Sequence, residues 1–246
     1  MLTEKDNQII NIVSEKDKNI SYLIDKLKEE HRFSISQISH EIRNPVTLIN
    51  SSLQLIEQQH PEVKTFSFWK ETMEDLAFLR TLLDELSSFN NGSLLHPEQK
   101  NLQDWIPNFF SSIKSLSAFS SLHLELKDNL PTVTWDCVKI RQVLNNLIRN
   151  SLEASPKNTP ILLKVSFLDP LVEMVVKDYG CGIPSSVFST LFEPFHTTKN
   201  TGTGLGLAIC KRIIDSHHGT ISISSKINRG TTVTIRIPQN PFCSCE

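Results

Sequence analysis

The sequence predicts an α+β protein in which a helical hairpin precedes an α/β sandwich. Residues 3 to about 92 show helical periodicity with few helix breakers, whereas the chain from about residue 94 alternates helical and strand-like stretches. Some strand-like stretches are adjacent pairs joined by short turns, which is typical of antiparallel hairpins. We therefore divide the 246 residues into four segments, 1–30, 31–94, 95–240 and 241–246.

The charge balance and hydropathy exclude several classes of protein. With 25 basic and 27 acidic residues, the chain lacks the strongly basic face that nucleic-acid binding usually needs. No apolar run approaches the roughly 20 residues that span a bilayer, and the N-terminal residues lack the apolar core of a signal peptide. We therefore expect a cytoplasmic protein with no nucleic-acid or membrane partner.

The cysteines favour reduced thiols over a disulfide framework, because there are five of them and they are scattered along the chain. Cys243 and Cys245 could contact a metal, but they have no Cys or His at ligand spacing nearby. We interpret residues 241–246 as a tail.

The first helix is expected from residue 3 to about residue 58. Its apolar residues at heptad spacing are Ile35, Ile38, Ile42, Ile49 and Ile56, and we call them the isoleucine stripe. This spacing is typical of the a and d positions of a packed helical seam. His40 then falls at position f, which points away from the seam and leaves the imidazole reachable.

A second helix is expected after the turn at residues 60–62, ending near Asn91-Gly92. It repeats Trp69, Leu76 and Leu83 every seven residues, with Leu79 and Leu86 between them. A hairpin with an apolar stripe on each helix cannot bury both stripes alone, so we predict a homodimer in which two hairpins form a four-helix bundle. The alternative is a hairpin that packs on its own second domain.

The remaining elements follow from breakers and periodicity. Asp136 is a plausible N-cap, and Asp169-Pro170 and residues 228–230 are expected turns. The expected helices are 101–118, 136–154 and 205–216, and the expected strands are 122–126, 133–135, 161–168, 172–177, 220–224 and 232–237.

Three motifs in the second half suit a bound nucleotide. Asn146 and Asn150 share one helix face, and amide oxygens suit a hard cation. The segment 178–182 offers the carboxylate of Asp178 to an exocyclic amine, with two glycines that let the backbone approach a base. The segment 202–206 opens a helix with free amide donors for phosphate, and Lys199 adds a mobile charge. The candidate cofactor-binding residues are therefore Asn146, Asn150, Asp178, Gly180, Gly182, Lys199, Gly202, Thr203, Gly204, Leu205 and Gly206.

A fourth motif, His-Glu-Ile-Arg-Asn-Pro at residues 40–45, lies in the first helix. His40 is the candidate nucleophile for phosphate, and Glu41 can accept a hydrogen bond from one ring nitrogen and so expose the other. Alternatively, Glu41 is a solvated helical charge. Asn44 lies one turn after His40 on the same face, and Pro45 removes a backbone donor and is expected to bend the helix.

The four motifs and their order resemble the sensor histidine kinases of bacterial two-component systems, and look similar to sporulation-type kinases, from about residue 33 to residue 238. The resemblance implies that segment 31–94 is a dimerisation and histidine phosphotransfer hairpin. It implies that segment 95–240 is a catalytic ATP-binding domain of the GHKL type, the histidine kinase and gyrase fold. Segment 1–30 is then a signalling helix for an upstream sensor protein, unless the chain is a fragment of something larger.

The resemblance also implies roles for single residues. Asn150 holds the Mg²⁺ that bridges ATP phosphates, Asp178 reads adenine, and Asn44 can position water for dephosphorylation of a partner. Asn146 stands where hydrolytic relatives such as gyrase carry a Glu that activates water, which favours phosphoryl transfer to a side chain over hydrolysis. Glu153 stands where many histidine kinases have a basic residue. Residues 188–195 resemble the phenylalanine-rich box beside the lid over ATP, although those phenylalanines could be core.

The sequence therefore predicts an ATP- and Mg²⁺-dependent protein histidine kinase. It is expected to autophosphorylate on His40 and to transfer the phosphoryl group to an Asp of a response regulator receiver domain, with phosphatase activity as an additional role. The alternatives are a phosphorelay phosphotransferase or scaffold with a non-catalytic nucleotide domain, and a serine kinase or ATPase of the same nucleotide fold.

Overall fold

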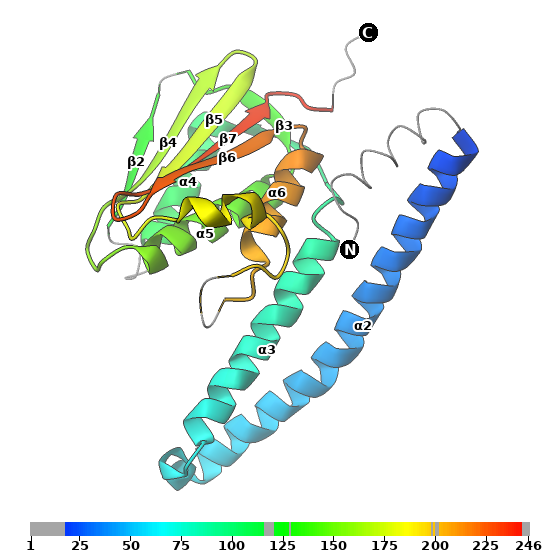
Figure 1. Cartoon of the computed structure of the whole chain (residues 1–246), viewed down its shortest axis with the longest axis vertical. Coiled ribbons are helices and arrows are strands. Elements are labelled where there is room, and N and C mark those ends of the chain that lie inside the picture. The colour runs from blue at the N-terminus through cyan, green and yellow to red at the C-terminus, as the bar shows by residue number, and fades with distance from the viewer. Residues whose placement is uncertain (1–17, 116–120, 128, 198, 200–201, 243–246) are drawn as a thin grey trace. The chain divides into compact units, whose positions relative to one another are not determined.

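The computed structural model describes residues 18–115, 121–127, 129–197, 199 and 202–242. The chain divides into two compact units, Met1–Asn91 and Gly92–Glu246 (Figure 1). No helix in the described part of the chain is long and apolar enough to cross a membrane. The beginning of the expected first helix and the cysteines at 243 and 245 lie outside the described residues.

The first unit is the predicted helical hairpin. It consists of α2 (Lys18–Gln59), the 3-10 helix η1 (Pro61–Thr65) and α3 (Trp69–Asn90). The helix α2 continues through Pro45. At the far end of the hairpin, Glu57 of α2 binds Lys64 at 2.9 Å and accepts a hydrogen bond from Trp69 Nε1 at 3.3 Å. These bonds to Lys64 and Trp69 lower the pKa of Glu57. They also connect α2 to η1 and to the first residue of α3.

The seam between α2 and α3 differs from the predicted one. Ile42, Ile49 and Ile56 of the isoleucine stripe are 42%, 52% and 41% exposed. The helix α2 instead packs against Leu76 and Leu83 of α3 with Val46 and the partly buried Leu53, while Ser39 is also buried. The residues that pack within the hairpin therefore also repeat every seven positions, but they are not those of the isoleucine stripe. The packed residues follow the stripe by four positions, which is about 40° around the helix.

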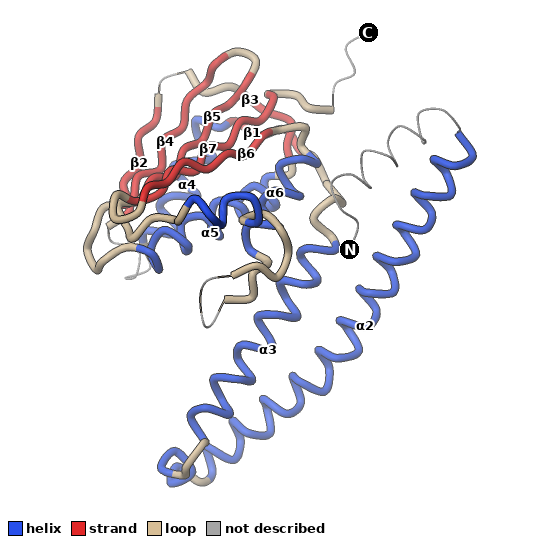
Figure 2. The backbone as a smooth tube through the Cα atoms, in the orientation of Figure 1, coloured by secondary structure: helices blue, strands red, loops and turns tan. Residues whose placement is uncertain are grey.

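The second unit is built on a five-stranded sheet of order β2-β4-β5-β7-β6, in which β2 and β4 are parallel and the other neighbours antiparallel. Figures 1 and 2 show α4, α5 and α6 on one face of this sheet. The strands are β1 (Glu98–Asn101), β2 (Leu122–Leu126), β3 (Thr132–Trp135), β4 (Ile161–Leu168), β5 (Leu171–Lys177), β6 (Thr220–Lys226) and β7 (Gly230–Pro238). The helices are α4 (Leu102–Lys114), α5 (Cys137–Ala154), η3 (Ser185–Thr190) and α6 (Gly206–Ser216).

These elements confirm the predicted α/β sandwich, including the hairpins β4-β5 and β6-β7. The strand β1, which pairs with β3, was not predicted because its residues Glu98–Asn101 are all polar and give no alternating pattern. The helix predicted from residue 101 to 118 is shorter, because α4 ends at Lys114. Alternating side chains such as Val165, Met174 and Ile235 face the helices and are buried with Trp135 and Phe109.

A buried polar cluster fixes the start of α5. Asp136 is the predicted N-cap, since its Oδ1 accepts from Lys139 N at 3.0 Å. His217 is fully buried, accepts from Asp136 N through Nε2 at 3.1 Å and contacts the Ile213 carbonyl through Nδ1 at 2.8 Å. Burial lowers the pKa of His217, so the ring is held neutral with its proton on Nδ1.

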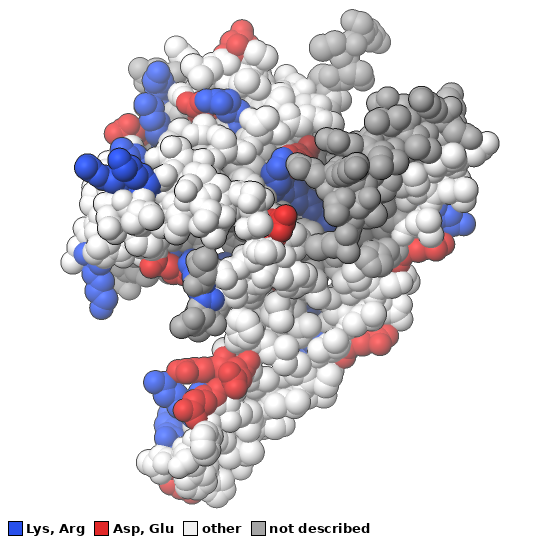
Figure 3. All heavy atoms as spheres, in the orientation of Figure 1, with Lys and Arg blue, Asp and Glu red and all other residues white. Residues whose placement is uncertain are grey.

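Acidic and basic side chains are mixed on the visible face of the molecule. On the face shown in Figure 3, Lys and Arg lie near Asp and Glu without merging into a broad area of one sign. This distribution agrees with the near balance of 25 basic and 27 acidic residues.

Candidate nucleotide site and phospho-acceptor

Asp178 is a buried carboxylate held by three donors. Its Oδ1 accepts from the backbone N–H groups of Gly180 at 2.9 Å and Thr231 at 3.0 Å, and its Oδ2 accepts from Ser151 Oγ at 3.2 Å. Because a carboxylate can accept about four hydrogen bonds, Oδ2 retains capacity for a further donor such as an exocyclic amine. Ser151 and Thr231 were not identified from the sequence, although Ser151 directly follows Asn150.

The glycines after Asp178 are required by the protein's own packing. A Cβ on Gly180 would collide with the carbonyl oxygen of Ala154, and one on Gly182 with that of Lys226. Gly182 also has φ +73°, a conformation that favours glycine. We predicted that these glycines let the backbone approach a base, and the structure shows that they also let this loop pack against α5 and β6.

The glycines of segment 202–206 differ in whether the protein's own packing requires them. A Cβ on Gly202 would come within 2.6 Å of Thr197 Oγ1, and Gly204, with φ +72°, packs on the backbone of Phe195. Leu205 is buried, and its N–H donates to Thr203 Oγ1 at 3.3 Å. At Gly206, the first residue of α6, the nearest atom to an added Cβ is Asn146 Nδ2 at 4.0 Å. The open space of this segment therefore lies where α6 begins and faces Asn146.

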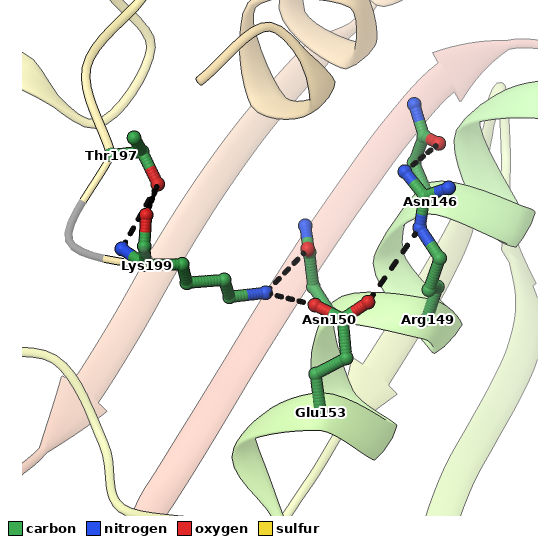
Figure 4. A network of polar contacts seen from close by, with 6 residues as sticks. All are labelled: Asn146, Arg149, Asn150, Glu153, Thr197 and Lys199. Atoms are coloured by element: carbon green, nitrogen blue, oxygen red, sulfur yellow. Dashed lines mark hydrogen bonds and ion pairs between the residues drawn. The ribbon is translucent and has the colours of Figure 1, made fainter. Parts of the chain in front are cut away.

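The two asparagines lie on one face of α5, as predicted, and Lys199 reaches Asn150 (Figure 4). Asn146 Nδ2 donates to the Gly206 carbonyl at 3.4 Å, which links α5 to the first residue of α6. Asn150 Oδ1 accepts from Lys199 Nζ at 3.1 Å. The same ammonium forms an ion pair with Glu153 Oε2. Lys199 is thus bound to α5 through Asn150 and through Glu153, the residue that stands where many histidine kinases have a basic one.

These residues fit a nucleotide with Mg²⁺. An amide oxygen such as that of Asn150 is a donor type that Mg²⁺ accepts, and this ion takes its other ligands mostly from phosphates and water. Among the described residues no group of three or more His, Cys, Asp and Glu is arranged to hold a metal. The open start of α6 offers backbone donors to phosphate.

The phenylalanine-rich segment is not core. Phe188 and Phe192 are half-buried, and Phe195 is 56% exposed with φ 67°. The N–H of Phe195 donates to the Gly204 carbonyl at 3.0 Å, so this segment is joined to the glycine-rich loop.

His40 lies in the other unit and is exposed on α2, as expected. Its Nδ1 is 3.3 Å from Arg43, whose guanidinium also binds Asp84 of α3 at 3.1 Å. Because a guanidinium only donates, Nδ1 is the acceptor and the ring proton lies on Nε2. The expected bond to Glu41 is not formed, because Arg43 occupies Nδ1 of His40, and Glu41 accepts from Gln37 at 3.1 Å. Arg43 was missed, although its place one helical turn after His40 is visible in the sequence.

Comparison with known proteins agrees with this geometry. Residues 136–241 match the family described as histidine kinase-, DNA gyrase B-, and HSP90-like ATPase. The catalytic domain of histidine kinase ThkA superposes with a TM-score of 0.53 and 32% identity, over 59% of this chain and 97% of that one. The chain belongs to the family of two-component histidine kinases.

Curated members of the histidine kinase family match over more of the chain. Sporulation kinase D of Bacillus subtilis is 31% identical over 204 residues, which are 81% of this chain and 40% of the relative. Signal transduction histidine-protein kinase AtoS of Escherichia coli is 28% identical over 83% of this chain and 34% of its own length. The chain thus spans less than half the length of these relatives.

One histidine kinase structure is similar over most of the chain. The crystal structure of ThkA in complex with the response regulator protein TrrA matches with a TM-score of 0.63 and 27% identity, over 90% of this chain and 66% of that one. The similarity therefore includes both units of the fold.

Proposed function

We propose that this histidine kinase autophosphorylates on His40 with ATP and transfers the phosphoryl group to an Asp of a response regulator. The observation that carries the proposal is the presence, on one chain, of an exposed histidine in the hairpin and a site with a fixed carboxylate, an amide ligand and an open helix start. The complex of ThkA with its response regulator supports the choice of partner.

The nucleotide roles are divided among the residues described above. Asp178 accepts a hydrogen bond from the adenine amino group, and backbone N–H groups at the start of α6 near Gly206 donate to phosphate. Asn150 binds Mg²⁺ through Oδ1. When bound, Mg²⁺ neutralises charge on the phosphates, which is the main requirement of phosphoryl transfer. Asn146 cannot act as a base, so the site lacks at this position the proton acceptor that would activate water.

His40 must change its hydrogen bonding before it can attack. With Arg43 on Nδ1 and the proton on Nε2, neither ring nitrogen presents a free lone pair. Attack by Nε2 requires that Arg43 release Nδ1 and that the proton move to Nδ1, where Glu41, the next residue, can accept a hydrogen bond. The nitrogen then bonds to the γ-phosphorus while the bond from that phosphorus to the β,γ-bridging oxygen breaks, and ADP leaves.

The hairpin is proposed to act as a dimer. The isoleucine stripe remains exposed beside the seam with α3, and fully burying such a side chain contributes roughly 1.5–3 kcal/mol. A second hairpin that covers these residues completes a four-helix bundle. The N-terminal end of α2 is proposed to connect this bundle to an upstream sensor protein.

Asn44 is proposed to orient water when the partner is dephosphorylated. It lies exposed on α2 one turn after His40. Asn44→Ala is expected to keep autophosphorylation within a few fold and to slow dephosphorylation of the regulator. Equal loss of both activities contradicts a specific phosphatase role.

The kinase activity is tested by incubating the chain with labelled ATP and then with acid. Phosphohistidine is acid-labile and phosphoserine is not, so acid-stable label points to a serine kinase. Absence of label, together with acceptance of phosphate from a phosphorylated regulator, points instead to a phosphorelay protein with a non-catalytic nucleotide domain.

A further inference from the structure

One ammonium group joins the candidate Mg²⁺ ligand to an acidic neighbour. Lys199 Nζ lies 3.1 Å from Asn150 Oδ1 and forms an ion pair with Glu153 Oε2, one helical turn further along α5 (Figure 4). The side chains of Lys199 and Glu153 are 41% and 48% exposed, so solvent and salt reach the pair.

The position of this ammonium conflicts with a metal on the same oxygen. Mg²⁺ binds oxygen at about 2.0–2.1 Å, and a lysine ammonium that hydrogen-bonds the same oxygen lies within a few ångströms of the ion. Two cations at that separation repel each other, and the amide oxygen carries no net charge that could compensate. Lys199 and Mg²⁺ therefore compete for Asn150 Oδ1.

We propose that Glu153 is a positioning residue that holds Lys199 on Asn150 Oδ1, so that Mg²⁺ binds with its nucleotide only by displacing this lysine. The inference rests on the proposed nucleotide site and adds a competitor to it. Displacement frees the ammonium for the nucleotide phosphates, and Arg149, whose Nε lies 4.0 Å from Glu153 Oε1, remains beside the carboxylate.

The opposite role for Glu153 makes an opposite prediction. If this carboxylate assisted Mg²⁺ through a water molecule or by its charge alone, its removal would raise the Mg²⁺ concentration that nucleotide binding needs. If it holds the competitor, its removal lowers that concentration. An exposed ion pair contributes up to about 1 kcal/mol, so the expected change is about two- to five-fold.

The test is a Mg²⁺ titration of ADP binding to the full chain, measured by calorimetry at constant ionic strength. ADP is chosen because it lacks the γ-phosphate, so loss of a contact from Lys199 to that group cannot obscure the result. Glu153→Gln and Lys199→Met are each expected to lower the half-saturating Mg²⁺ concentration about two- to five-fold. In the Lys199→Met background, Glu153→Gln should no longer lower it.

The matched control is Glu193→Gln, which removes a carboxylate that pairs with His196 at 3.2 Å. It should leave the half-saturating Mg²⁺ concentration unchanged, and Glu153→Asp should restore part of the competition. A value for Glu153→Gln that is unchanged or raised in the wild-type background overturns the proposal while the nucleotide site stands. Failure of the wild-type chain to bind ADP at any Mg²⁺ concentration overturns the nucleotide site, and the competition with it.

Discussion

The two units differ in how completely they bury their apolar side chains. Within the described residues, the hairpin buries only Val46, Val63, Leu76 and Leu83, whereas the α/β unit buries a continuous core that includes Trp135, Phe109 and Met174. Most large hydrophobic residues of α2, including Ile38 and Ile49, are exposed. The α/β unit buries its apolar side chains within its own core, while the hairpin leaves an apolar face exposed that a second copy can cover.

The units also differ in how they hold their reactive groups. Asp178 is fixed by two backbone N–H groups and a serine hydroxyl in a buried position, which defines one geometry. His40 is exposed, and its contact is with an arginine that is shared with Asp84 of α3. The proposed nucleotide site is thus preorganised, whereas the hydrogen bonding of the proposed acceptor depends on a contact between α2 and α3.

The largest expected effect is that of His40→Gln, which should separate the function of the hairpin from that of the α/β unit. This variant should abolish phosphate incorporation, because it removes the acceptor, and should leave ADP binding unchanged, because the nucleotide site lies wholly in the other unit. Label incorporation and calorimetry measure the two effects. Label that persists in the variant would show that His40 is not the acceptor.

The converse division is expected for Asn150→Ala and Asp178→Ala. Both should lose kinase activity, since one removes the proposed Mg²⁺ ligand and the other the proposed adenine contact. Both should still accept phosphate on His40 from a phosphorylated regulator. Loss of this reverse transfer as well would mean that the hairpin does not work independently of the α/β unit.

The motif glycines should separate folding from binding within the α/β unit. Gly180→Ala is expected to lower the free energy of unfolding by about 1–3 kcal/mol, because its Cβ collides with the Ala154 carbonyl. Gly206→Ala should leave stability nearly unchanged and weaken ADP binding, because its Cβ occupies the space before α6. Thermal unfolding and calorimetry distinguish these outcomes, and similar destabilisation in both variants would contradict the distinction.

The two faces of α2 should separate association from hairpin packing. Ile49→Lys changes an exposed residue and is expected to weaken dimerisation, as measured by sedimentation, without unfolding the helices. Val46→Ala should instead destabilise the hairpin by about 1–2 kcal/mol, because Val46 packs against Leu76 and Leu83. If Val46→Ala weakened dimerisation and Ile49→Lys did not, the dimer contact would not involve the isoleucine stripe.

The smallest expected effect concerns His217 and acts on the α/β unit. Burial lowers the pKa of His217, so the unfolded chain binds a proton more readily than the folded one. The contribution of neutral His217 to the free energy of unfolding is fully present above about pH 6.5. It is lost as the pH falls from there towards the lowered pKa of His217 in the folded chain. His217→Gln keeps a donor and an acceptor without titrating, so its melting temperature should depend less on pH than that of the wild type. The exposed His218→Gln is the control.

Much of this molecule could be predicted from local patterns. Helix periods, N-caps such as Asp136, and turns such as Asp169-Pro170 act through neighbouring residues, and they were confirmed. Asn146 and Asn150 were also expected on one helix face, because their spacing is a property of the helix itself. The polar strand β1 was missed because its only signal is its partner β3.

The sequence by itself determined most of the elements, their order and the residue types of the candidate site, because periodicity and motif spacing act over a few residues. Tertiary structure decided which face of α2 packs on α3, since an amphipathic helix chooses its seam only when a partner surface is present. It likewise decided that Ser151 and Thr231 hold Asp178, and that Lys199 binds both Asn150 and Glu153. These contacts join residues that are 27 to 53 positions apart, and folding alone brings such residues together.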